Sequence, residues 1–199
     1  EENGKRYGFD KVIMQAGGVG YGVLKDAKKF EPKTGDKIVV MGGDNYRIGM
    51  GGSAVSSLDT GASNSSIELN AIQRSNPEMQ KRVFNAIRAM MESGENPIVS
   101  IHDHGAGGHL NCLSELVEDT GGKIDLSKLP VGDPTLSAKE IVGNESQERM
   151  GLVINEAHLD TLQRVAERER APLYVVGDIT GDHRFTFESS ITGAKPIDW

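Results

Sequence analysis

Three short polar segments hold the side chains that could do chemistry. The first is His102-Asp103-His104-Gly105-Ala106-Gly107-Gly108, which follows an apolar run and precedes a helix-like pattern. Its carboxylate, Asp103, could hold a hard cation such as magnesium, which prefers oxygen ligands and usually keeps several waters. Gly105, Gly107 and Gly108 would let a ligand oxygen approach the backbone, and the start of the following helix favours an anion. The segment is equally compatible with a tight strand-to-helix turn that Asp103 caps.

Two further segments could contact a ligand. One is Asn144-Glu145-Ser146-Gln147-Glu148-Arg149, which lies just before an apolar run. Its carboxylates, hydroxyl, amide and guanidinium can hydrogen-bond to a phosphate or to a metabolite with several hydroxyls. The other is Gln73-Arg74-Ser75-Asn76, in which Gln73 could both donate to a ligand and accept from it. Taken alone, each segment is also typical of an exposed polar loop or a helix cap.

The histidines and the single cysteine offer two other interpretations. His102 and His104, together with His109, could bind zinc, although a third ligand of the usual kind is not obvious in the pattern. Cys112 lies inside the apolar helical spacing of residues 110–116, which is typical of a buried, inert thiol rather than a nucleophile. The sequence contains neither a Gly-x-Ser-x-Gly elbow nor a Gly-x-x-x-x-Gly-Lys-Ser/Thr loop.

The apolar pattern predicts the elements that must position these segments. Residues 37–41 have the pattern of a short buried strand. The clearest helix begins at Asn76, a typical N-cap, has Pro77 at its first position and ends at Gly94. The remaining patterns predict helices over 110–117, 137–142 and 158–170, and strands over 97–101, 123–129, 151–155, 173–176 and 184–187.

The alternation of strands and helices predicts an α/β (α+β) domain, a sandwich in which helices pack on a mixed sheet. The order is βαββαβ-like and therefore ferredoxin-like, and the turn at Gly181-Asp182 predicts antiparallel pairing between the strands on either side of it. Residues 1–34 are expected to be an irregular lead-in from the preceding part of a longer chain, because the sequence begins without a methionine. Residues 35–199 are expected to form the folded domain.

Composition narrows the classes of partner. The 199 residues are 37% apolar, which is enough for one hydrophobic core. The net charge of −7 leaves no basic surface for nucleic acid, and no apolar stretch approaches the length of a membrane span. A single cysteine cannot form an internal disulfide, which predicts a reducing, cytoplasmic location.

The order of the three polar segments carries a family resemblance. Gln73 with Pro77 and Glu78 comes first, the Asp103 segment second, and the segment from Asn144 to Arg149 last. In this order they resemble the first PurM-type C-terminal domain of phosphoribosylformylglycinamidine synthase (formylglycinamide ribonucleotide amidotransferase), in its large single-chain form. The last segment is the discriminating one, because the Asp103 segment also occurs more loosely in relatives such as aminoimidazole ribonucleotide synthetase. The resemblance covers essentially the whole chain and implies a PurM C-terminal-like fold.

The resemblance also implies a reaction. That family uses ATP to activate the amide oxygen of formylglycinamide ribonucleotide (FGAR), and ammonia from glutamine then displaces phosphate to give formylglycinamidine ribonucleotide. By resemblance, Gln73, Glu145, Ser146 and Gln147 would contact FGAR, and Asp103 would ligate Mg²⁺. The close approach of a ligand to the three glycines after Asp103 remains an expectation from their residue type.

Two parts of that family are missing from this sequence: the ATP-binding half, with its catalytic histidine in a Ser-His-Asn-His-Pro type motif, and the glutaminase domain. These domains of the parent chain are the expected partners, and most of the ATP contacts would be theirs. The isolated chain is expected neither to hydrolyse ATP nor to release ammonia from glutamine. Excision would expose an apolar surface, so homodimers of the isolated domain are expected. The alternative is a non-catalytic domain that only braces the ATP-binding half.

Overall fold

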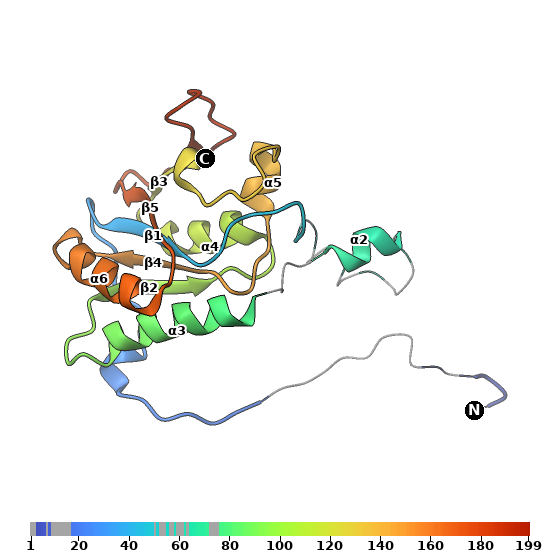
Figure 1. Ribbon diagram of the computed structural model, residues 1–199, viewed down its shortest axis with the longest axis horizontal. Helices are drawn as coiled ribbons and strands as arrows, with labels where there is room; N and C mark the ends of the chain where they lie inside the picture. The colour runs from blue at the N-terminus through green and yellow to red at the C-terminus, as the bar shows by residue number, and fades with distance from the viewer. Residues whose placement is uncertain are drawn as a thin grey trace.

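A seven-stranded mixed sheet with helices on both faces organises the chain (Figure 1). The structure is a computed structural model, and it describes residues 3–6, 8, 17–49, 51, 55, 58, 62, 64–71 and 76–199. The strands are β1 (Lys37–Met41), β2 (Ile98–Asp103), β3 (Gly122–Asp125), β4 (Met150–Ile154), β5 (Leu173–Ile179), β6 (Phe185–Glu188) and β7 (Ile197–Asp198). The α-helices are α2 (Ser65–Leu69), α3 (Pro77–Met91), α4 (Gly108–Val117), α5 (Ala138–Gly143) and α6 (Leu159–Glu169). Three short 3₁₀ helices are η1 (Leu24–Asp26), η2 (Leu126–Lys128) and η3 (Glu156–His158).

The ferredoxin-like order is confirmed in one half of the sheet. The sheet order is β2-β4-β1-β5-β3-β6-β7, and β1, β2, β4 and β5 pair only in antiparallel fashion with one another. The units β1-α3-β2 and β4-α6-β5 supply these four strands, and α3 and α6 pack against each other. The chain from α4 to α5, which includes β3, is inserted between the two units, and β3, β6 and β7 extend the sheet beyond β5. The α+β class and the mixed sheet are thus as predicted.

The predicted hairpin at Gly181 is wrong. Strands β5 and β6 do not pair, because β3 lies between them, antiparallel to β5 and parallel to β6. The chain around Gly181 instead wraps around the start of β3: the Thr180 amide donates to the Gly121 carbonyl, and the Gly122 amide donates to the Arg184 carbonyl. Gly177 makes room for β3, because a Cβ there would overlap the Lys123 carbonyl oxygen.

The predicted strand over 123–129 is also too long. Strand β3 ends at Asp125, whose carboxylate accepts a hydrogen bond from the Ser127 amide and so turns the chain into η2. A short side chain that bonds to the backbone two residues later competes with a strand ladder. The alternation of apolar residues over this stretch therefore gave the correct start and the wrong end.

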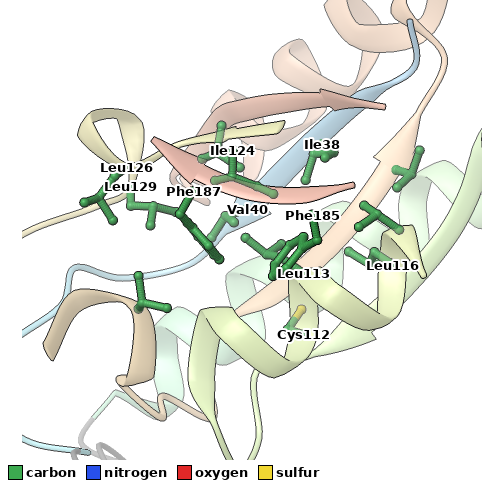
Figure 2. Packing of buried hydrophobic residues seen from close by; sticks show 14 of the residues in the cluster. Ile38, Val40, Cys112, Leu113, Leu116, Ile124, Leu126, Leu129, Phe185 and Phe187 are labelled. Atoms are coloured by element: carbon green, nitrogen blue, oxygen red, sulfur yellow. The ribbon is translucent and has the colours of Figure 1, made fainter. Parts of the chain in front are cut away.

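Alternate residues of β1 face two hydrophobic clusters. Val39 and Met41 pack in the cluster covered by α3 and α6. Ile38 and Val40 pack in the other, where α4 covers the opposite face of the sheet, and Figure 2 shows Leu113 of α4 against this cluster. Because both faces are buried, a shift of one residue in the register of β1 would exchange these two sets of side chains. The register that positions the end of β1 is therefore strongly specified.

The start of α3 is as predicted, and its cap can be tested. The Asn76 side-chain oxygen accepts a hydrogen bond from the Met79 amide at 2.9 Å, and Pro77 occupies the first turn. We expect Asn76→Ala to lower the free energy of unfolding by about 1 kcal/mol, because the amide loses its acceptor. Gln80→Ala, an exposed position in the same helix, should change stability by less than about 0.5 kcal/mol. Urea denaturation of both variants measures the difference; equal stabilities would contradict the assigned cap.

Candidate functional site

Two of the three predicted functional segments, those around Asp103 and around Glu145, meet at one edge of the sheet. In the strand register Met150 of β4 lies beside Met41 of β1 and beside Asp103 of β2. Strands β1 and β2 end at this edge and β4 begins there, so the segments that follow β1 and β2 lie next to the segment that precedes β4. Helix α4 begins at the same edge, because only a short turn separates it from β2 (Figure 1).

Asp103 presents a carboxylate at this edge. It is the last residue of β2, and 71% of its side chain is exposed. His102 braces the backbone here, because its Nδ1 lies 2.8 Å from the Asp103 carbonyl oxygen while its Nε2 contacts the Glu115 carboxylate. A Cβ at Gly105 would lie 2.9 Å from Oδ2 of Asp103, so the absence of a side chain leaves room beside the carboxylate. The carboxylate is accessible to a solvated cation.

The glycines after Asp103 shape the turn into α4. Gly107 is the N-cap of α4 in the left-handed conformation, and the Gly108 amide donates to the Gly105 carbonyl at 3.0 Å. Gly108 is buried with φ of +59°, and a Cβ there would lie 2.6 Å from the carbonyl carbon of Asn144. The close approach at Gly108 is therefore to the backbone of the segment from Asn144 to Arg149. Contact of a ligand with Gly105, Gly107 or Gly108 stays a prediction.

The segment that precedes β4 is held by the loop that follows β1. The buried Asn144 side chain donates to the carbonyl oxygens of Tyr46, at 3.1 Å, and Ile48. The amide of Glu145 donates to the Gly49 carbonyl at 2.7 Å. These contacts connect residues nearly a hundred positions apart in the chain. They fix the backbone on which the next three side chains are mounted.

Two buried polar atoms on this backbone lack a partner in the part of the chain that the structure describes. They are Oε2 of Glu145 and Oγ of Ser146, in residues that are 4% and 0% exposed. Gln147 is exposed, and its Nε2 donates to the other Glu145 oxygen at 3.3 Å. An unsatisfied buried polar group costs roughly 1–3 kcal/mol. A water, an ion or a ligand could supply the hydrogen bonds that these two atoms can still make.

A buried cationic network lies behind this backbone, and the sequence reasoning missed it. Arg149 is completely buried; one terminal nitrogen lies 2.8 Å from Nε2 of His109, and the other donates to the Asn144 side-chain oxygen. His109 in turn contacts His104 at 2.9 Å. Burial lowers the pKa of Arg149 to about 10, so it stays charged at neutral pH. Burial and the Arg149 charge hold the pKa of His109 and His104 well below the usual range, so both rings are neutral.

A zinc site through the three histidines does not form. Among the described residues there is no group of three or more His, Cys, Asp or Glu side chains that could hold a metal ion. His104 and His109 are buried against each other, whereas His102 contacts Glu115. Cys112 is completely buried, and burial raises the pKa of its thiol far above its usual range. The prediction that Cys112 is a buried core residue is confirmed.

One predicted ligand contact lies outside the described residues. This is Gln73, together with its neighbours Arg74 and Ser75. The structure brings Asp103 to the same edge as Glu145, Ser146 and Gln147, and the role of Gln73 there stays a prediction. No helix among the described residues has the length and apolar character to cross a membrane.

Comparison with protein families and known sequences gives consistent matches. The family model described as "AIR synthase related protein, C-terminal domain" matches residues 33–189. A relative from Dictyostelium discoideum named phosphoribosylformylglycinamidine synthase is 46% identical in an alignment of 184 residues that covers 90% of this chain. A relative of the same name from Homo sapiens is 43% identical over 184 residues, which is 92% of this chain. The chain spans 14% of the length of each of these relatives.

Solved structures share the fold. A chain of Thermotoga maritima PurL complexed with FGAR matches with a TM-score of 0.74 and 26% identity, over 85% of this chain and 28% of that chain. The Escherichia coli hydrogenase maturation protein HypE matches with a TM-score of 0.54 and 13% identity, over 82% of this chain and 48% of that chain. The likeness to HypE concerns the fold alone.

Proposed function

We propose, because the chain belongs to the family of AIR synthase related protein C-terminal domains, that it is one domain of a phosphoribosylformylglycinamidine synthase. This ligase would convert FGAR, ATP and glutamine to formylglycinamidine ribonucleotide. The names and identities of the two relatives and the FGAR complex of the similar PurL chain support the proposal. The remaining domains of the parent chain would bind most of the ATP and release ammonia from glutamine, so the isolated chain would be inactive. A reducing compartment such as the cytoplasm suits its single thiol.

The domain would supply one wall of the FGAR site. Glu145, Ser146, Gln147 and Gln73 would contact the substrate, whose ribose hydroxyls and amide offer both donors and acceptors. The observation that carries this proposal is the pair of buried, unpartnered atoms, Oε2 of Glu145 and Oγ of Ser146. A substrate hydroxyl or amide that bonded to them would recover the cost of their desolvation.

Asp103 would ligate Mg²⁺ in the same site. Magnesium keeps several waters and is held by one or two carboxylates together with substrate oxygens, so a single exposed carboxylate is a fitting donor set. When bound, the ion would stabilise negative charge that develops on phosphoryl oxygens. The space that Gly105 leaves beside the Asp103 carboxylate would admit the hydrated ion and the ligand.

The substrate wall can be tested with Ser146→Ala in the full-length enzyme. We expect the KM for FGAR to rise about tenfold, because one hydrogen bond to the ligand is worth about 1.4 kcal/mol. The matched control is Ser114→Ala on α4, whose hydroxyl bonds to a carbonyl of its own helix. Steady-state kinetics with varied FGAR measures both variants. An unchanged KM for both Ser146→Ala and a Gln73→Ala variant would favour a domain that only braces the ATP-binding half.

A further inference from the structure

The hydrogen bonds of the buried network have a fixed direction. An arginine side chain donates hydrogen bonds and accepts none, so Nε2 of His109, 2.8 Å from Arg149, must be the acceptor. The Asn45 amide nitrogen lies 3.2 Å from the same Nε2 and can also only donate. His109 therefore carries its proton on Nδ1 and donates from there to Nε2 of His104. The network runs in one direction, from Arg149 to His109 to His104.

The second terminal nitrogen of Arg149 bonds to the loop that carries Glu145 and Ser146. It donates to the side-chain oxygen of Asn144, which leaves the Asn144 side-chain nitrogen to donate to Tyr46 and Ile48. The guanidinium therefore sets which way the Asn144 side-chain amide faces. Asn144 immediately precedes Glu145 in the loop. Replacing the arginine removes the donor that selects this orientation.

The backbone packs closely against the Arg149 side chain and against Asn144. Gly42, with φ of +125°, lies so close that a Cβ there would be 2.6 Å from Cγ of Arg149. Gly108 packs closely against the backbone of Asn144. Arg149 also touches His109 in α4, so one side chain joins the loop that precedes β4 to the helix that follows Asp103.

The partners of Arg149 are unusual for a buried cation. Its two hydrogen-bonded partners are a neutral imidazole and an amide, and the nearby negative charges of Glu148 and Asp44 also attract it. Burial of a charge with neutral partners is costly, and hydrophobic replacement of buried charges is often neutral or stabilising. What the guanidinium adds at this place is its pair of hydrogen bonds, to His109 and to Asn144.

We propose that Arg149 is a positioning residue for the FGAR site: through Asn144 it sets the loop that carries Glu145 and Ser146, and through His109 it ties that loop to the helix after Asp103. This inference rests on the proposed function and adds a residue that does not itself contact the substrate. The guanidinium is buried behind the loop, so its effect on binding passes through the backbone and side chains it holds.

The test compares two core variants of the full-length enzyme, Arg149→Met and Leu162→Ala. Leu162 is fully buried in α6, in the cluster on the sheet face covered by α3 and α6, so its replacement lowers the melting temperature by opening a cavity remote from the loop. Arg149→Met is expected to raise the KM for FGAR at least ~10-fold, with kcat within about threefold of wild type. Arg149→Lys, whose single ammonium cannot replace both hydrogen bonds of the guanidinium in the same geometry, should have a KM between those of wild type and Arg149→Met. Leu162→Ala should leave the KM unchanged.

Glu145→Ala serves as the reference for interpretation. If Glu145→Ala raises the KM but Arg149→Met does not, the positioning role is wrong and the proposed function stands. If neither variant changes the KM, the proposed FGAR site itself is wrong. A histidine spectrum supplies a readout independent of substrate: in ¹⁵N NMR of the chain, which has five histidines, His109 should be a neutral ring protonated at Nδ1. A His109 ring protonated at Nε2 would overturn the network even if Arg149→Met failed to fold.

Discussion

Glu145→Ala in the full-length enzyme is expected to raise the KM for FGAR about 100-fold while leaving the protein as stable as wild type or slightly more stable. A hydrogen bond from a ligand to an ionised carboxylate is worth about 1.5–3 kcal/mol, and the variant loses it. In the structure, Oε2 of Glu145 is buried without a partner among the described residues. Its removal therefore relieves a desolvation cost, so function and stability should change in opposite directions.

Two variants sharpen this result. Glu145→Gln keeps the shape and removes the charge, and we expect a smaller increase in KM than for alanine. Glu95→Ala changes an exposed carboxyl in the segment between α3 and β2, at the opposite end of β2 from Asp103, and should change neither quantity. Kinetics with varied FGAR and thermal denaturation measure the two effects. A large loss of stability with an unchanged KM would show that Glu145 is a structural residue.

Gly108→Ala should be strongly destabilising, by about 3 kcal/mol or more. Alanine at a φ of +59° costs about 1 kcal/mol or more, and its Cβ would lie within 2.8 Å of both the amide nitrogen and the carbonyl carbon of Asn144. Backbone atoms cannot move aside without shifting the whole loop, and overpacking of this kind costs a further 1–3 kcal/mol, roughly.

Gly143→Ala is the matched control for this prediction. It is the last residue of α5, next to the same loop, and no atom lies within 4 Å of the position of an added Cβ. We expect its stability to stay within about 0.5 kcal/mol of wild type. Urea denaturation of the two variants measures the difference. If Gly108→Ala were as stable as Gly143→Ala, the tight packing of α4 on the Asn144 backbone would be refuted.

Local signals in the sequence were sufficient for elements whose ends are set by neighbouring residues. Asn76 caps α3 as predicted, and Ser137 with Glu140 forms a capping box that starts α5 close to the predicted position. The position of β3 depends on a different kind of information. Whether the strands around Gly181 pair with each other or with β3 is decided by packing over long sequence separations, which the apolar pattern of either strand does not encode.

The candidate site likewise contains residues that the sequence indicated and contacts that it did not indicate. Residue types together with the family resemblance singled out Asp103, Glu145, Ser146 and Gln147 as candidates, and the register of β2 with β4 explains why these positions share an edge. The bond between Arg149 and His109 spans 40 positions, and neither residue type specifies the other as its partner. A signal was nevertheless present: Arg149 and His109 each lie beside an apolar pattern, and a polar side chain that is buried with such a pattern needs a hydrogen-bond partner.

The most direct test of the account is a crystal structure of the full-length enzyme with FGAR and Mg²⁺ bound. We expect a carboxylate oxygen of Glu145 and the hydroxyl of Ser146 within hydrogen-bond distance of FGAR, and the ion coordinated by Asp103. A structure in which FGAR binds elsewhere, while Oε2 of Glu145 and Oγ of Ser146 bond to water or to other protein groups, would contradict it.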